Sequence, residues 1–328
     1  MARVFIGDMK PGELIEDQVF LVASKDLRTT TQGALYIHAI LMDRTGQMPA
    51  RMWQATQGVF DTLPEGGFIR LRGRVENYKG SLQFIIDAVR PVEVKDVDLE
   101  EFLPRTAKNV EQMWDRLLEI LRGIENEHLL AFVAEFVRDE DFVASFKRAP
   151  AATQLHHAYL GGLLEHTLNV LEVALVVLPH YPDLSPDLVL VGVFLHDIGK
   201  TAELSYQTSF SYTDEGQLVG HLVQAAVWVD RRAEAAAAKT GKPFPPDLKA
   251  VLQHIVLSHH GTHEFGSPKL PAVPEAVFIH HLDNIDAKMN SMFRQIREDK
   301  DDKSDWTQYI RSINTRIYKR DVTAAPNA

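Results

Sequence analysis

The first part of the chain, from Leu14 to Val92, alternates apolar and polar residues in short runs. A period of two is typical of β-strands that bury one face. The pattern predicts five strands, near residues 14–24, 33–43, 47–53, 67–78 and 81–91. Turn residues separate them at 43–46, 64–67 and 79–80, and residues 54–63 suit a short helix between the third and fourth strands.

Five strands with a helix between the third and the fourth is the order of an OB-fold barrel. Barrels of this type commonly bind single-stranded nucleic acid, whereas other small barrels give a similar pattern without that function. We predict an OB-fold nucleic-acid-binding domain over residues 1–93.

The pattern changes after the barrel. Residues 94–108 are acidic, contain Pro104 and show no sustained period, so we interpret them as a linker. The rest follows helical spacing with no convincing strand, which predicts an all-α domain over 109–322 and a flexible tail over 323–328. The candidate helices span 108–122, 126–137, 160–178, 187–197, 216–239, 247–259, 273–296 and 305–317.

Composition and charge narrow the function classes. The chain has no cysteine, which excludes disulfides, thiolate metal ligands and a cysteine nucleophile. The formal charge of −10 is uneven: residues 1–95 carry +1 and the remainder −11. No signal-peptide pattern opens the chain, and the apolar stretch 163–179 contains Glu165, His166 and Glu172, so we expect a cytoplasmic protein without a membrane segment.

Twelve of the 14 histidines lie between His156 and His281. A single buried histidine is usually a structural residue, but clustering is what a metal site built from several helices produces. The most specific element is His196-Asp197-Ile198-Gly199-Lys200, which follows an apolar run. We expect Gly199 to adopt a left-handed conformation that ends the helix and lets His196 and Asp197 converge. Asp197 could then bridge two cations, and Lys200 could meet an anionic substrate.

The order of the remaining candidates resembles that of the HD-domain metal-dependent phosphohydrolases, in the version that binds two metals. His166 precedes the His-Asp pair, and His221, the tandem His259-His260 and Asp283 follow it. The resemblance implies that His166, His196, Asp197 and Asp283 hold the first ion. It implies that Asp197 also reaches the second ion, with His221, His259 and His260. We expect Asp286 to support a ligand, and we assign no ligand role to His180, His254, His280 or His281.

The predicted ligands are imidazole and carboxylate groups, which suit Mn²⁺, Fe²⁺, Ni²⁺, Co²⁺ or Zn²⁺. Two such ions about 3.5–4 Å apart can activate a water molecule and stabilise charge on a phosphate group. We expect Asp197 and Lys200 to take part in catalysis, with Lys200 adding positive charge near the transition state. Hydrolysis of a phosphate ester is the class of reaction that the motifs indicate.

Several stretches are similar to one branch of that superfamily, the YhaM-type 3′-to-5′ exoribonucleases. They are residues 156–167, Ser258-His259-His260-Gly261, residues 264–269 and Asp286-Ala287-Lys288, and the layout of a barrel before the helical domain matches as well. The resemblance implies removal of nucleotides from the 3′ end of single-stranded RNA, with single-stranded DNA as a further candidate and Mn²⁺ as the expected metal. It makes His157, Lys200 and Lys288 candidates for binding substrate.

The family resemblance gives the barrel a role. Arg70, Arg72 and Arg74 alternate on one strand face, and Arg51 and Trp53 share a face of the preceding strand. Guanidinium groups and an aromatic ring can follow phosphates and stack on bases, although a solvated strand face would look the same.

Two other functions fit parts of the pattern. The helical domain could hydrolyse a small nucleotide while the barrel serves regulation or assembly, or the chain could be a nucleic-acid-binding module without catalysis. A complete set of ligands argues against the latter. The sequence is compatible with a homo-oligomer.

Overall fold

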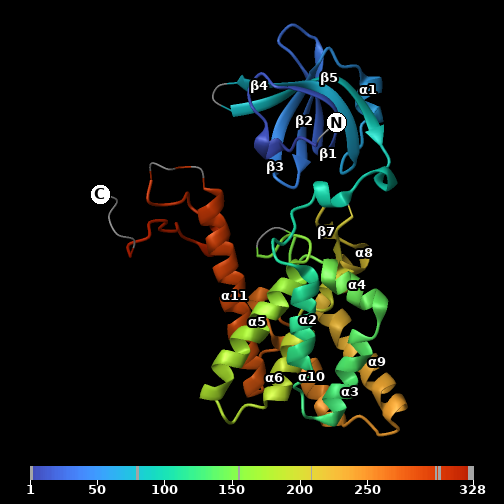
Figure 1. The fold of residues 1–328 in the computed structure, drawn as a ribbon, viewed down its shortest axis with the longest axis vertical. Helices are drawn as coiled ribbons and strands as arrows, with labels where there is room; N and C mark the ends of the chain where they lie inside the picture. Colours follow the sequence, from blue (N-terminus) through green and yellow to red (C-terminus); the bar gives the residue numbers. More distant parts are fainter. Residues whose placement is uncertain are drawn as a thin grey trace. The chain divides into compact units, whose positions relative to one another are not determined.

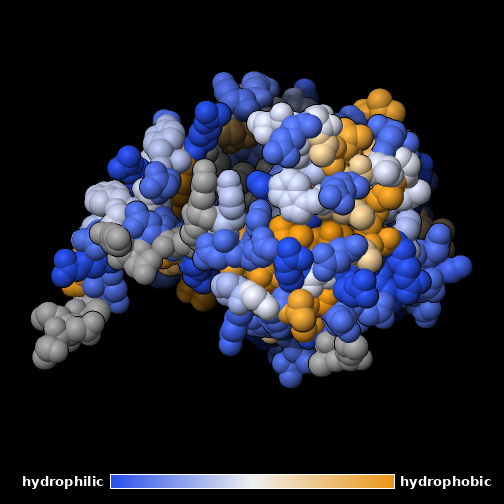
Figure 2. All heavy atoms as spheres, turned by 90° about the horizontal axis from the view of Figure 1, so that it is seen from above, coloured by the Kyte–Doolittle hydropathy of each residue, from blue (hydrophilic) through white to orange (hydrophobic). Residues whose placement is uncertain are grey.

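A computed structural model of the chain describes residues 3–78, 81–153, 156–207, 209–299, 301 and 304–323. The chain divides into two compact units (Figure 1). The first combines Met1–Ala107 with Leu204–Thr213, and the second combines Lys108–Glu203 with Asp214–Ala328. Polar and charged residues cover most of the face drawn in Figure 2, with smaller hydrophobic patches between them.

The first unit is a closed barrel with the strand order β1-β2-β3-β5-β4. Neighbouring strands are antiparallel except β3 and β5, which pair in parallel where the barrel closes. The arrangement confirms the predicted five-stranded OB-fold; the predicted turn at Lys79-Gly80 lies outside the described residues. The elements are β1 (Leu14–Thr29), β2 (Leu35–Asp43), β3 (Gly46–Trp53), α1 (Gln57–Thr62), β4 (Phe68–Tyr78) and β5 (Ser81–Val92), preceded by a 3₁₀ turn at Ile6–Asp8.

Alternation along the strands separates the barrel core from its outer surface. On β2, Ile37, Ala39 and Leu41 are buried, while Tyr36 and His38 lie on the opposite face. Because each strand sorts its side chains in this way, the arginines and aromatic residues of the outer face are held at fixed registers.

The acidic stretch after β5 forms two 3₁₀ turns, Val94–Asp96 and Leu99–Glu101. Phe102, which follows, is buried, and its ring centroid lies 4.7 Å from that of Phe68 on β4. The segment that we expect to be a linker therefore packs its apolar end within the first unit.

The second unit is helical, as predicted. Four of its helices begin at an Asn, Asp or Ser whose side chain accepts a hydrogen bond from a backbone N–H of the first turn, at Asn109, Asn126, Asp139 and Ser185. The helices are α2 (Val110–Leu121), α3 (Glu127–Val137), α4 (Glu140–Arg148), α5 (Gly162–Val177), α6 (Pro186–Leu195), α7 (Lys200–Glu203), α8 (Asp214–Leu218), α9 (His221–Thr240), α10 (Pro246–Ser258) and α11 (Pro274–Glu298), with 3₁₀ turns at Leu178–His180, His263–Phe265 and Arg311–Ile313.

The centre of this unit is formed by α5 and α6, which contact each other and α11. Seven consecutive residues of α6, Val189–Leu195, are buried. Among the described residues, one segment, Gly162–His180, is long and apolar enough to cross a membrane. Because 61% of its apolar window is buried within the structure, its hydrophobicity is that of a core helix.

Four expectations for this part of the chain were wrong. Residues 305–317 are not a helix: Trp306 pairs with Tyr318 and Ile310 with Thr315 in isolated bridges, and Asn314 turns the chain with φ of 51°. Aromatic and β-branched residues favour this extended conformation. The short strands β6 (Leu204–Ser205) and β7 (Ser211–Tyr212) pair where no strand was expected, and α4 was not predicted. The segment expected as one helix over 216–239 is broken at Gly220, where φ is 76°.

We expect Gly73→Ala on β4 to loosen the barrel, because the added Cβ would lie 2.0 Å from the backbone oxygen of Ile85 on β5. The expected loss is about 1–3 kcal/mol in the free energy of local opening. Gly58→Ala in α1 is the matched control: its nearest neighbour would be 3.9 Å away. It should be neutral or stabilise by up to about 1 kcal/mol. Hydrogen–deuterium exchange of β4 and β5 amides measures both, and unchanged protection in Gly73→Ala would contradict the prediction.

Candidate metal centre

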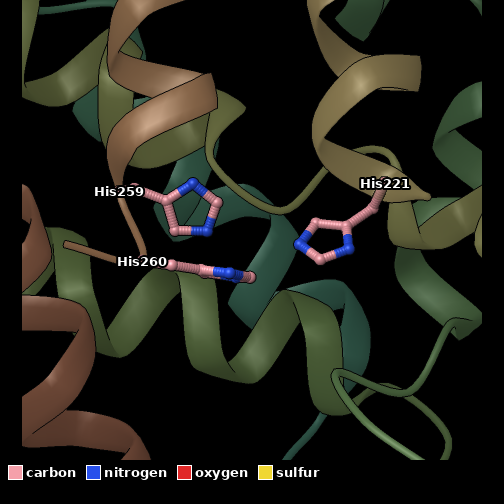
Figure 3. A group of neighbouring side chains, drawn as sticks. All are labelled: His221, His259 and His260. Atoms are coloured by element: carbon pink, nitrogen blue, oxygen red, sulfur yellow. The ribbon is translucent and has the colours of Figure 1, made fainter. Parts of the chain in front are cut away.

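Helix ends bring the predicted ligands into one place in the second unit. His166 lies on α5 and Asp283 on α11, His196-Asp197 follow the last residue of α6, and His259-His260 follow the last residue of α10. His221 is the first residue of α9. In Figure 3 the rings of His259 and His260 come from one helix end and that of His221 faces them from another.

The first group surrounds the Nε2 atom of His166. That atom lies 3.0 Å from His196 Nε2 and 3.2 Å from Asp283 Oδ1. Asp197 Oδ2 lies 3.6 Å from His166 Nε2 and 3.4 Å from His196 Nε2. Two ring nitrogens and two carboxylates therefore converge on one small volume.

The second group lies on the other side of Asp197. One ligand atom from each of His221, His259 and His260 falls within 4.8 Å of the others. The second carboxylate oxygen, Asp197 Oδ1, lies 3.6 Å from both His221 Nε2 and His259 Nε2. Asp197 thus directs one oxygen to each group.

Three atoms of the second group are buried without a hydrogen-bond partner among the described residues: Asp197 Oδ1, His221 Nε2 and His259 Nε2. Buried polar atoms are almost always hydrogen-bonded, and these three face the same space. A cation would satisfy all of them at once, so these residues fit a divalent metal ion.

All five ring Nδ1 atoms point away from the centre and donate to an oxygen of the protein. When a ring is neutral, this arrangement fixes its tautomer and leaves the lone pair on the inward-facing Nε2. The acceptors are Val193 O for His196 at 2.6 Å, Val256 O for His259 at 2.8 Å, Phe265 O for His260 at 2.9 Å, Glu203 Oε1 for His221 at 2.9 Å and Asp286 Oδ2 for His166 at 2.7 Å.

Electrostatics keep the two carboxylates of the centre ionised. Burial tends to raise the pKa of Asp197, but Lys200 and the histidines outweigh it and hold that pKa well below its usual range. Burial by itself would lower the pKa of His166, but hydrogen bonds to Asp283 and Asp286 outweigh it and raise that pKa to about 10. For His196, burial outweighs the nearby charges of Asp197 and Asp283 and lowers the pKa to about 4. Asp197 and Asp283 therefore present negative charge to the space that an ion would occupy.

Lys200 is buried and donates from Nζ to Asp197 Oδ2 at 2.7 Å. Its ammonium group also lines a pocket of about 210 Å³ beside the centre. The other lining residues come from several elements and include five that the sequence did not single out for the site; they are His156, Asp197, His260, Phe265, His280, Asp283, Asn284 and Ala287.

The structure shows where His157, predicted to bind substrate, lies. Its ring is buried, with Nε2 2.8 Å from Asp286 Oδ2 and Nδ1 2.8 Å from the hydroxyl of Tyr159. His157 therefore supports Asp286, and its neighbour His156 lines the pocket instead. Lys288 is exposed on α11, one residue beyond the pocket residue Ala287.

Gly199 also differs from expectation, because its φ is not positive. A Cβ at Gly199 would lie 2.2 Å from the backbone oxygen of His221. The glycine is needed so that the turn after Asp197 can pack directly on the start of α9. Glu203, which no sequence signal marked, completes this contact: its Oε1 accepts hydrogen bonds from both the backbone N–H and the ring of His221.

The barrel residues predicted to bind nucleic acid fall into two groups. Arg51 lies over the rings of Trp53 and Tyr78, at 5.6 and 5.2 Å, and the Trp53 ring is 5.0 Å from that of Tyr36. On β4, Arg70 pairs with Asp17 at 3.0 Å. Further along the strand, Arg74 pairs with Glu76 and Asp87. Arg72, between them, is exposed and makes no ion pair with the described residues.

Comparisons with known proteins agree with this geometry. A family model described as HD domain matches residues 163–288, which include every predicted ligand. The chain is 32% identical over 303 residues to the 3′-5′ exoribonuclease YhaM of Bacillus subtilis (strain 168), covering 92% of this chain and 93% of the relative. It is also 32% identical over 307 residues to the protein of the same name from Geobacillus sp. (strain WCH70), covering 93% and 92%.

Among solved structures, the second OB-fold domain of replication protein A from Methanococcus maripaludis is similar to part of this chain. The match covers 30% of this chain and all of that domain, with 16% identity and a TM-score of 0.22. The curated relatives extend over both units. Because they are 32% identical over more than nine-tenths of both chains, the chain belongs to the YhaM family of 3′-5′ exoribonucleases.

Proposed function

We propose that this protein is a metal-dependent 3′-to-5′ exoribonuclease that hydrolyses single-stranded RNA at a centre of two divalent cations and releases nucleoside 5′-monophosphates. The observation that supports two ions is the position of Asp197, whose two oxygens face two separate groups of histidines. The function itself rests on the family to which the chain belongs.

In this proposal His166, His196, Asp197 and Asp283 hold the first ion. Asp197, His221, His259 and His260 hold the second. The ligands are nitrogen and oxygen atoms only, and we propose Mn²⁺ as the metal, although Fe²⁺, Ni²⁺, Co²⁺ and Zn²⁺ suit the same donors. When bound, such ions activate a water molecule and stabilise negative charge on the phosphate.

The protein's own groups orient the reactants. Lys200 holds Asp197 in place through a 2.7 Å hydrogen bond and presents positive charge to the pocket, where a phosphate group of the strand would lie. The five Nδ1 contacts keep the ligand rings from rotating, which preserves the arrangement before substrate arrives. The pocket is small, so it suits the end of a strand rather than its middle.

The barrel is proposed to hold the strand upstream of its 3′ end. Trp53 is 43% exposed and packs against Tyr36, so the exposed part of its ring can contact a base. Arg51, beside it, can contact a phosphate. Arg72 offers a cation that no described carboxylate neutralises, and Arg70 and Arg74 contribute less because acidic side chains already pair with them.

We expect the wild-type protein to bind two Mn²⁺ ions per chain, measured by isothermal titration calorimetry. His166→Ala and His259→Ala should each bind one, because each removes a ligand of a different ion, and Asp197→Ala should weaken both. His180→Ala is the matched control, since His180 is exposed on the turn after α5. One ion in the wild type, or the same residual ion in both single variants, would contradict a dinuclear centre.

We expect Asp197→Ala to lower turnover of 5′-labelled single-stranded RNA by about 10³-fold or more while binding to RNA stays nearly unchanged, because the carboxylate acts through the ions. Products are resolved by length with and without a chelator, beside hydrolysis of mononucleotides. A chelator-sensitive ladder that shortens from the 3′ end supports the proposal. Intact RNA with hydrolysed mononucleotides would instead favour the small-nucleotide phosphohydrolase.

We expect Arg72→Ala together with Trp53→Ala to raise the KM for long RNA more than for a dinucleotide. Arg72→Ala alone should reduce the slope of log affinity against log salt by about 0.7, the value for one phosphate contact on a single strand. Arg74→Ala is the control, because Glu76 and Asp87 already neutralise Arg74 and the slope should change less. Equal effects on the KM for long RNA and for the dinucleotide would show that the barrel does not bind the RNA substrate.

A further inference from the structure

Phe265 is an aromatic residue that the fold keeps exposed at the edge of the catalytic pocket. It is 66% exposed, yet it lines the same pocket as Asp197, Lys200 and Asp283. Neither metal binding nor the support of a ligand needs its ring, since the contact with His260 is made by the backbone oxygen of Phe265. The ring therefore has no role in the centre as described so far.

The loop that carries Phe265 is held firmly. Phe265 N and Ser267 N both donate to Thr262 O, at 3.2 and 3.1 Å, and Gly266 turns the chain with φ of 85°. Ser267 is buried, and its hydroxyl contacts the backbone oxygens of Leu257 and Lys269 at 3.1 and 2.8 Å. These hydrogen bonds hold the backbone that carries the Phe265 ring. The same backbone accepts a hydrogen bond from the predicted ligand His260.

We propose that Phe265 is a substrate-positioning residue that stacks on the base of the 3′-terminal nucleotide, the one about to be removed. The inference rests on the proposed function. A rigid exposed ring beside a phosphodiester-cleaving centre can bind the flat face of a base, and stacking fixes the terminal nucleotide so that its phosphate reaches Lys200 and Asp197. Because every base has such a face, this contact requires a base but does not distinguish among the four bases.

The test uses 5′-labelled single-stranded RNAs that end in each of the four bases or in an abasic ribose. For Phe265→Ala we expect kcat/KM on base-bearing ends to fall by about 10- to 100-fold, the effect of losing one base–aromatic stack, mainly through KM. Phe265→Trp should retain activity. On the abasic end, the wild type should already show this loss and Phe265→Ala should add nothing, because the two changes remove the same interaction.

Two controls separate stacking from a structural role. Phe293→Ala removes another exposed ring, 56% exposed on α11, that does not line the pocket, and should leave kinetics unchanged. Titration with Mn²⁺ should give the wild-type affinity and stoichiometry for Phe265→Ala, since the backbone oxygen that orients His260 remains.

A direct signal comes from RNA with 2-aminopurine at its 3′ end, bound to the uncleaving Asp197→Ala protein. Stacking should quench the fluorescence, and adding Phe265→Ala should restore it. Equal losses on abasic and base-bearing ends, loss of Mn²⁺ binding, or unchanged quenching would each overturn the inference. Protein that shortens no RNA would overturn the proposed function and this inference with it, whereas RNA cleavage indifferent to Phe265 overturns the inference alone.

Discussion

The centre depends on one buried carboxylate. Asp197 is withdrawn from water, and a buried anion is tolerated only where opposite charge and hydrogen bonds stabilise it. Lys200 supplies one partner directly, while the remaining oxygen faces only the Nε2 atoms of His221 and His259. Asp197 Oδ1 therefore has no hydrogen-bond partner among the described residues, and a cation would supply one.

At the ends of α6 and α10, a single histidine–carbonyl hydrogen bond serves both the helix terminus and the candidate metal centre. The last carbonyls of a helix lack intrahelical partners, and at two of these ends a histidine ring supplies the missing donor. His196 donates to Val193 O after α6, and His259 donates to Val256 O after α10, in each case three residues back. Each hydrogen bond gives a carbonyl at the helix terminus a donor and turns Nε2 toward the candidate metal position. The candidate ligands therefore follow directly after the last residue of both helices.

The strands of the barrel were predictable because their alternation follows from local sequence, whereas the candidate ligands were identified through a family resemblance in their order. Alternation places residues on the faces of strands, and the order of histidines and aspartates is specific when taken as a set. Contacts that depend on tertiary packing were not predictable. Glu203 reaches His221 only because Gly199 lets the backbone of His221 come within contact, and nothing in the spacing of these residues shows it. His156 and His157 are adjacent, and only the fold determines which ring enters the pocket. In residues 305–317, apolar spacing suggested a helix, but Asn314 and the aromatic residues favoured a turn between extended segments.

An acidic chain can still act on a polyanion, because its charge is not distributed evenly. The helical part carries the excess of acid. Within the centre, the negative charges of Asp197 and Asp283 are matched by the ammonium of Lys200 and by His166, whose pKa is raised, so the site without ions offers phosphate little net attraction. In the proposed centre, two divalent cations would add positive charge locally, and only at the ligands. The barrel, in contrast, holds Arg51 and Arg72 on its outer face whether or not metal is present. Under the proposed function, attraction of the strand by the barrel would therefore be independent of the metal, whereas cleavage at the pocket would require it. Such a division would let the same chain bind RNA without ions and cleave it only when the centre is complete.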